Sequence, residues 1–308
     1  MFIHIYLDHN ILDEISKVRL NLKPSSEVVW VYSNESFSEI KRSGDRRFLD
    51  VLDSIQARKL EIALDSEFRI TGRAQVLEYR SAHEAYESYL DANEGFETDE
   101  RSDHEVMARL FGAENKTQII SHPEVFEKNI KALLEPLGLY NETMKEKVKQ
   151  VRNMLDDFVK GPLQDVGKLE DTRHALGSGR GRAGNLAEKD NPVQELWKLI
   201  SKGVGDITED QYFGFDPVDK QGYQEWPMFL GIVGCYTVLN HLGFRPDEGL
   251  AKPESIPGIL SDASHVAHAA YCHGLLSRDR RLLMKARAIY RYKNIGTQVL
   301  TISNSRQE

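Results

Sequence analysis

Apolar residues in the first part of the chain follow two alternating patterns, short β-branched or aromatic runs and longer stretches with helical spacing. The short runs predict strands at Phe2–Leu7, Glu27–Tyr32 and Leu60–Leu64. The longer stretches predict helices at Asn10–Arg19, Ser36–Lys41 and Arg46–Arg58. Strands that alternate with helices favour a parallel sheet with crossover helices.

The middle of the chain lacks a convincing strand pattern, and helical spacing dominates it. Helices are predicted at Glu67–Leu90, Ser102–Phe111, Pro123–Leu137, Glu142–Val159, Pro192–Ser201 and Tyr223–Leu242. Asp190 is expected to cap the helix that begins at Pro192. The segment Lys168–Lys189 contains G-S-G-R-G-R-A-G and is expected to be a mobile loop. It is not a phosphate-binding P-loop, because it lacks G-K-[ST] and follows no strand.

The α/β pattern returns near the end of the chain. Its predicted elements are a helix at Gly258–His273, a strand at Leu275–Ser277, a helix at Arg280–Tyr290 and a strand at Gln298–Ile302. The predicted fold class is therefore α/β, with a central parallel sheet flanked by helices. Residues 1–65 and 246–308 are expected to build this domain, and residues 66–245 to form a large, mostly helical insertion.

Composition adds limits on the class of protein. At 308 residues, 40% hydrophobic and 29% charged, the chain is typical of a soluble globular protein. Cys235 and Cys272 lie in apolar helical stretches, where two buried thiols are expected rather than a disulfide. No CxxC pair is present, which disfavours a zinc ribbon. These observations favour a reducing, cytoplasmic location.

Neither a signal peptide nor a membrane span is expected. The segment that begins M-F-I-H-I-Y-L-D has no basic leader and reaches an acid after a few residues. The longest apolar stretch, Trp226–Leu239, is too short to cross a bilayer and is expected to be a buried helix.

Charge is segregated along the chain. The net charge of −8 argues against an extended nonspecific coating of nucleic acid, but a local basic groove is compatible with it. Between Arg278 and Lys293 there are seven Lys/Arg and one acid. The residues predicted to track a phosphate backbone are Arg278, Arg280, Arg281, Lys285 and Arg287. Tyr290 and Tyr292 either stack on bases or pack inward behind a solvated basic face.

Four acids lie where strands are followed by helices. Asp8 and Asp279 each follow a strand, Asp262 opens a helical stretch, and Glu39 lies on the helix after the second strand. Parallel strands present their carboxyl ends at one edge of a sheet, so these side chains are expected to converge. An oxygen cluster without cysteine or histidine is typical of a magnesium or manganese site.

Each acid also has a simpler interpretation. Asp8, Asp262 and Asp279 are suitable helix N-caps, and Glu39 suits a solvated helix face. His265, His268 and His273 suggest zinc by their spacing, but no HExxH motif or fourth ligand accompanies them.

These motifs resemble those of PIN-domain nucleases. The resemblance lies in Y-L-D-H-N-I-L, F-S-E-I, D-A-S-H-V-A-H-A-A and L-L-S-R-D-R-R-L, within roughly the first 65 and last 50 residues. It implies a PIN-like parallel sheet and a metal-binding set of four acids. The matching residues are Asp8, Glu39, Asp262 and Asp279, with Asn10 and Ser277 as the accompanying polar residues. The chain departs from the family pattern in its large insertion and in His265 and His268, where small apolar residues are more usual.

The resemblance implies a divalent-metal-dependent endoribonuclease that hydrolyses phosphodiester bonds with one or two Mg²⁺ or Mn²⁺ ions. Asp8 and Asp279 would be the principal ligands, Asp262 a second or bridging ligand, and Glu39 a ligand or water-orienting base. RNA is favoured over DNA as the substrate. A toxin-like or defence effector is compatible with this function by family analogy. A structure-specific DNA nuclease, a catalytically silent PIN-like scaffold, a homodimer and a regulatory protein partner stay open as alternatives.

Overall fold

The computed structural model describes most of the chain and divides it into two compact units. The described residues are 2–67, 69–94, 101–114, 121–161, 163–164, 166–179 and 181–302, with backbone only at 101 and 102. The first unit comprises Met1–Tyr89, Arg173–Pro246 and Leu260–Glu308. The second comprises Leu90–Thr172 and Asp247–Ile259. These limits differ from the insertion expected at 66–245. Residues 66–89 and 173–245, which precede and follow residues 90–172 in the sequence, belong to the first unit with the sheet.

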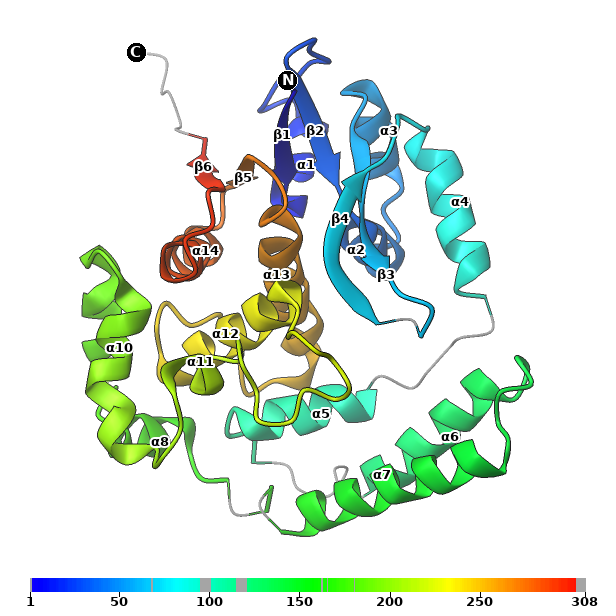
Figure 1. Ribbon diagram of the computed structural model, residues 1–308. Coiled ribbons are helices and arrows are strands. Elements are labelled where there is room, and N and C mark those ends of the chain that lie inside the picture. Colours follow the sequence, from blue (N-terminus) through cyan, green and yellow to red (C-terminus); the bar gives the residue numbers. More distant parts are fainter. Residues whose placement is uncertain are drawn as a thin grey trace. The chain divides into compact units, whose positions relative to one another are not determined.

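The first unit is built on a six-stranded sheet of order β4-β3-β2-β1-β5-β6 (Figure 1). The strands are β1 (Ile3–Leu7), β2 (Val28–Tyr32), β3 (Arg58–Leu64), β4 (Ile70–Val76), β5 (Gly274–Ser277) and β6 (Gln298–Thr301). Every neighbouring pair is parallel except β3 and β4. The prediction of an α/β fold whose largely parallel sheet joins both ends of the chain is confirmed.

Strand β1 lies inside the sheet because its apolar side chains are buried on both faces. Tyr6 and Leu7 are fully buried, and adjacent residues of a strand point to opposite faces. Tyr6 pairs in register with Val31 of β2 on one side and with Leu275 of β5 on the other. Both neighbours are buried with it in one hydrophobic core. A parallel strand in this environment reads as the continuous apolar run seen in the sequence.

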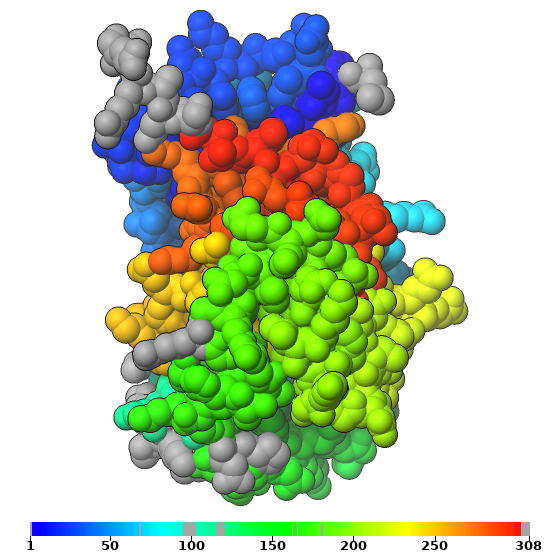
Figure 2. Space-filling model, turned by 90° about the vertical axis from the view of Figure 1, so that its left-hand side faces the viewer, coloured from blue at the N-terminus to red at the C-terminus, as the bar shows by residue number. Residues whose placement is uncertain are grey.

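Helices cover both faces of the sheet. Helix α1 (His9–Ser16) packs against α3 (Arg47–Ser54) and β5, and α2 (Asn34–Ser43) packs against β3. The helices that share the Tyr6 core are α10 (Pro192–Ile200), α12 (Met228–Leu242), α13 (Ile256–Ala269) and α14 (Arg280–Tyr292). Figure 2 shows the red C-terminal elements against the blue N-terminal ones, in keeping with the pairing of β5 with β1.

The second unit is helical. Its elements include α5 (Arg101–Leu110), α6 (His122–Leu134) and α7 (Glu142–Lys160), of which α6 and α7 pack together. Val159 and Leu163 form a small buried core. Arg109 stabilises the chain beside this core by donating hydrogen bonds to the backbone carbonyls of Leu163 and Gln164.

The predicted helix over Glu67–Leu90 is wrong in its first half. The segment first forms β4, antiparallel to β3, and a helix follows only at α4 (Ala82–Ala92). The Asp65 carboxylate accepts hydrogen bonds from the backbone N–H groups of Glu67 and Arg69, which turns the chain back along β3. Pairing along the edge of β3 therefore outweighs helical propensity here. Phe68 lies outside the described residues.

The predicted loop over Lys168–Lys189 is also wrong. This segment contains α8 (Leu169–Ala175), α9 (Arg182–Asn185) and a 3-10 helix at Leu186–Glu188, with Arg180 outside the described residues. The Arg173 guanidinium anchors it by donating to the carbonyls of Asn240 and His241 at the end of α12.

Two smaller expectations have clear outcomes. Asn191, not Asp190, caps α10, since its side chain accepts from the Gln194 N–H. Both cysteines are buried free thiols, as expected, and burial raises the pKa of each. Among the described residues, no helix combines the length and apolar character that a bilayer crossing requires.

Candidate functional site

The topology of the sheet has a switch point between β1 and β5. From β1 the chain proceeds through β2 and β3 on one side, whereas β5 and β6 are added on the other side. In open parallel sheets, ligands bind beyond the carboxyl ends of strands at such a switch point. Asp8 follows β1 here, and Asp279 follows β5 by two residues. The two acids therefore lie at one edge of the sheet, as their positions in the sequence predicted.

Asp8 is buried and held by side chains rather than by a helix end. Only 3% of the residue is exposed. It occupies the N-cap position of α1, but its side chain makes no capping hydrogen bond. Its Oδ2 atom accepts hydrogen bonds from Ser277 Oγ, at 2.6 Å, and from the Asn10 amide. The capping interpretation therefore does not describe Asp8.

Asn10 and Ser277 join the two strand ends. Asn10 Nδ2 donates to Ser277 Oγ at 3.0 Å, and Asn10 Oδ1 accepts from the Arg278 N–H at 2.9 Å. Ser277 Oγ also accepts from the Asp279 N–H at 2.9 Å. These bonds fix the loop after β5 against the loop after β1, so both residues have the supporting position expected of them.

Asp279 is the N-cap of α14. Its Oδ1 atom accepts hydrogen bonds from the N–H groups of Arg281, at 2.7 Å, and Leu282, at 3.0 Å. The capping interpretation is therefore correct for this oxygen. Asp279 is linked to Asp8 through Ser277, and it also lines a surface cavity of about 630 Å³.

Glu39 reaches the same cluster from α2. Its Oε2 atom lies 3.1 Å from His265 Nε2, which in turn lies 3.9 Å from Asp8 Oδ1. Its Oε1 atom accepts from Ser261 Oγ at 2.9 Å. The Glu39 side chain is only 15% exposed, so it does not belong to a solvated helix face.

His265 is the central residue that the candidate set did not include. It is fully buried between the two carboxylates and Tyr6, whose hydroxyl lies 2.8 Å from His265 Nδ1. The Tyr6 hydroxyl also lies 2.7 Å from Ser33 Oγ. A second histidine, His9, places its Nδ1 atom 3.2 Å from Glu39 Oε2. The signal in the sequence was a histidine on a helix face that otherwise carries small apolar residues.

Burial and the interactions of His265 shift the pKa values in this cluster in opposite directions. Burial raises the pKa of Asp8. Burial alone would also raise the pKa of Glu39, but the charge and hydrogen bond of His265 lower it to about 2. Burial opposes protonation of His265, but Tyr6 and the two carboxylates raise its pKa well above the usual value. The neighbouring carboxylates therefore favour the protonated form of His265, and that charge in turn lowers the pKa of Glu39.

Asp262 does not begin a helix. It lies in the middle of α13, so the expected N-cap role and the stabilisation by a helix N-terminus are both wrong for this residue. Ser261 and His265, which contact Glu39, lie on either side of it in the sequence. Residues three apart share a helix face, so Asp262 lies beside His265 one turn earlier.

The three histidines suspected of binding zinc do not converge. His268 Nδ1 hydrogen bonds the Ser264 carbonyl, and its ring stacks on Tyr6. His273 accepts a hydrogen bond from the His4 N–H at the opposite end of β1. Each of these rings is therefore held by its own neighbours.

One residue of the basic segment, Lys285, was placed wrongly. Lys285 is fully buried, with Nζ 2.9 Å from Asn240 Oδ1 and 4.1 Å from the centre of the Tyr236 ring. Arg278 forms an ion pair with Glu14. Lys285 cannot contact a nucleic acid at the surface, because it stabilises the interior of the Tyr6 core.

The two tyrosines of this segment pack inward. The Tyr290 hydroxyl donates to the Val266 carbonyl inside the core. The Tyr292 hydroxyl donates to Asp210 Oδ1 at 2.6 Å. The base-stacking alternative is therefore wrong, and the inward-packing alternative is correct.

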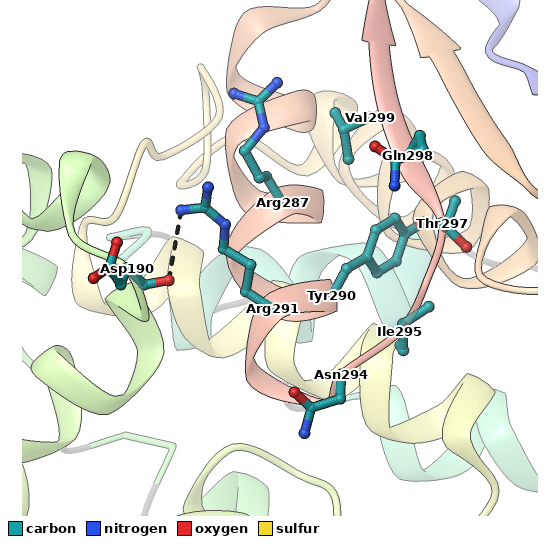
Figure 3. Close-up of a pocket in the computed structure, with 9 residues that line it drawn as sticks. All are labelled: Asp190, Arg287, Tyr290, Arg291, Asn294, Ile295, Thr297, Gln298 and Val299. Carbon is teal, nitrogen blue, oxygen red and sulfur yellow. Dashed lines mark hydrogen bonds between the residues drawn. The ribbon is translucent and has the colours of Figure 1, made fainter.

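The exposed arginines of α14 line two cavities. Arg280 and Arg281 line the cavity that also contains Asp279. Arg287 lines a second cavity of about 790 Å³ further along the helix, where Arg291 donates to the Asp190 carbonyl (Figure 3). The prediction that Arg278, Arg280, Arg281 and Arg287 contact nucleic acid remains a prediction.

The acidic side chains at this edge are oxygen donors, the type of ligand that a hard divalent cation prefers. Asp8 is a buried carboxylate, and Glu39, Asp262 and Asp279 supply further oxygens on the neighbouring elements. His265 lies between Asp8 and Glu39, however. Within the described ranges, no three or more His, Cys, Asp or Glu side chains are close enough together to hold a metal ion. The chemistry of the residues suits a cation, and their present arrangement is closed around His265.

Comparison of the chain with family models, with curated proteins and with solved structures found no match.

Proposed function

We propose that this protein is an endonuclease that hydrolyses RNA phosphodiester bonds at the carboxyl edge of β1 and β5, with Mg²⁺ or Mn²⁺ as its cofactor. The observation that carries the proposal is the buried Asp8 carboxylate, which is tied through Asn10 and Ser277 to the segment that bears Asp279. Burying a carboxylate costs free energy. Ligands bind at the topological switch point of such a sheet, so a buried carboxylate at this position is explained by a role in binding or catalysis.

The roles of the residues follow from their positions. Asp8 and Asp279 would be the principal ligands of a cation, with Asp262 as a second or bridging ligand and Glu39 as a ligand or water-orienting base. When bound, the cation supplies Lewis-acid stabilisation of the phosphate and a lowered pKa for the attacking water. Asn10 and Ser277 orient Asp8. His265 holds Glu39 and Asp8 together through its ring nitrogen.

Cleavage-site mapping on total cellular RNA tests this proposal. Wild-type protein and Asp8→Asn are each incubated with Mg²⁺, with Mn²⁺ or with EDTA, and the RNA ends are sequenced. We expect metal-dependent cleavage by the wild type and a loss of about 10²–10³-fold in Asp8→Asn, because a charged group at the reacting phosphate is removed. Equal cleavage by both proteins, or cleavage unaffected by EDTA, would reject the mechanism.

A parallel incubation with single-stranded and flapped DNA separates RNA from DNA specificity. Faster cleavage of DNA than of RNA under the same metal conditions would assign the site to a DNA nuclease of the same chemistry. Circular dichroism of Asp8→Asn shows whether the fold is retained, so that loss of activity is not confused with unfolding.

A further inference from the structure

A cavity rich in arginine lies beside the acidic cluster. It has a volume of about 630 Å³ and is lined by Arg245, Pro246, Asp279, Arg280, Arg281 and Met284. This volume falls within the roughly 300–1,000 Å³ typical of small-ligand pockets. Asp279 joins the cavity to the cluster, because its N–H donates to the serine that hydrogen bonds Asp8.

Arg245 is the arginine of this cavity that lies outside the predicted basic segment. It follows the end of α12 and has a φ of 47°, in the left-handed region that bulky residues rarely occupy. Its Nε atom is buried, and among the described residues it has no hydrogen-bond partner. A buried donor without a partner costs free energy, so an acceptor from a ligand would stabilise this arrangement.

The lining has two chemical characters. Three guanidinium groups, from Arg245, Arg280 and Arg281, suit the oxygens of a phosphate, which they can bind with paired hydrogen bonds. Met284 and Pro246 add apolar surface, against which a ribose or base can pack. The Asp279 carboxylate repels an anion at one end, so a phosphate is expected to bind toward the arginines.

We propose that this cavity binds one unpaired nucleotide of the substrate strand, with its phosphate at the arginines and its base or ribose against Met284. The proposal rests on the proposed function and extends it to the form of the substrate. A base that enters a cavity of this kind must be unstacked and unpaired, whereas a duplex presents mainly its backbone. The site therefore selects single-stranded over paired RNA.

Fluorescence anisotropy in EDTA tests the proposal without cleavage. The probes are a labelled single-stranded oligonucleotide and a hairpin of equal length, titrated with wild type, Arg245→Asn and Arg280→Gln. We expect tighter binding of the single strand by the wild type and about tenfold weaker binding by each variant, since each loses a charge-assisted contact. The magnitude of the slope of log affinity against log salt concentration should decrease by about 0.7 in each variant.

Two controls separate a binding role from a structural one. Asn adopts the left-handed conformation readily, so Arg245→Asn is expected to keep its melting temperature within about 2 °C of the wild type. Arg73→Gln removes an exposed arginine from the edge strand β4 and is expected to bind as the wild type does. Arg245→Lys, which keeps the charge but not the planar fork, should show an intermediate affinity.

The outcomes distinguish this cavity from the proposed function. Unchanged affinity and salt slope in Arg245→Asn, or equal affinity for hairpin and single strand, would overturn the nucleotide site. Cleavage by the wild type in Mn²⁺ would still support the nuclease in that case. Specific binding in EDTA that depends on Arg245, together with no cleavage in any metal, would support the cavity and reject the nuclease.

Discussion

The buried cluster around Asp8 and the cavity around Arg245 lie at the same edge of the sheet but are built in opposite ways. In the cluster, each charged group is held by another protein group, and His265 compensates Asp8 and Glu39. The cavity is lined by three arginines, and Arg245 Nε has no hydrogen-bond partner among the described residues. The charged groups of the cluster are satisfied by one another, whereas in the cavity the Arg245 Nε donor is available to a ligand.

The difference matters because catalysis and binding need different surroundings. Groups that act on a reacting phosphate must be fixed before the reaction, which requires burial and supporting hydrogen bonds. Groups that bind a flexible strand must be accessible and strongly charged. Asp279 belongs to both regions, since it caps α14, follows Ser277 and lines the cavity.

The largest effect is expected at Asp279, where capping and chemistry can be separated. Asn is as good an N-cap as Asp, so the unfolding free energy of Asp279→Asn should lie within about 0.5 kcal/mol of the wild-type value. Its cleavage rate should nevertheless fall about 10²–10³-fold, because the carboxylate charge is lost. Denaturant unfolding and a cleavage assay in Mn²⁺ measure the two effects.

Asp279→Ala provides the matched control, since it removes the cap and the charge together. It should lose activity to the same extent and also lose about 1 kcal/mol of unfolding free energy. Full activity in Asp279→Asn would show that Asp279 is only a helix cap, and the comparison between the two regions would lose its common residue.

The buried side of the comparison can be tested through pH at His268. Burial lowers the pKa of this ring to about 4, whereas the ring takes up a proton near its usual pKa of 6.5 when the chain unfolds. The contribution of the neutral His268 ring to the free energy of unfolding is therefore complete above pH 6.5. It is lost as the pH falls to 4, by up to about 3 kcal/mol. We expect the unfolding free energy of His268→Gln to decline less steeply over this range.

The measurement is denaturant unfolding of both proteins at several pH values between 4 and 7. Parallel curves for wild type and His268→Gln would contradict the burial of this histidine behind Tyr6. No comparable difference is expected for Arg245→Asn, because arginine stays charged throughout this range.

The smallest effect is expected from the two faces of α14. Lys285→Met removes the buried Nζ donor of Asn240 Oδ1, which should cost about 1–3 kcal/mol of unfolding free energy and leave RNA affinity unchanged. Arg280→Gln should instead change the unfolding free energy by no more than about 0.5 kcal/mol and weaken RNA binding. Weaker RNA binding by a stable Lys285→Met would contradict the buried position of this lysine.

The sequence predicted the parts of the fold whose signal is local. The runs at Phe2–Leu7 and Val28–Tyr32 gave buried parallel strands, because continuous apolar β-branched residues are typical of them. The same strand ends indicated Asp8 and Asp279, since junctions of strands and helices lie at one edge. Asn10 and Ser277 were indicated only by the resemblance of the motifs around these acids to those of PIN-domain nucleases.

The remaining features depend on contacts between distant segments. The pairing of β4 with β3 and the anchoring of α8 by Arg173 are tertiary effects that a local pattern does not contain. Lys285 belongs to the same basic helix as the exposed arginines, and its sequence context does not distinguish it from them. Its burial becomes apparent only from its contact with Asn240 on α12. His265 and Arg245 gained their roles in the same way, from neighbours far along the chain.

Titration calorimetry with Mn²⁺ tests the central claim most directly, because it measures cation binding at the acidic cluster without any substrate. The comparison is between wild type, Asp8→Asn and the control Glu61→Gln, whose acid is exposed on β3. We predict that the wild type and Glu61→Gln bind the ion alike and that Asp8→Asn binds it at least about tenfold more weakly. Equal affinity of Asp8→Asn and wild type would contradict a metal-dependent site at Asp8.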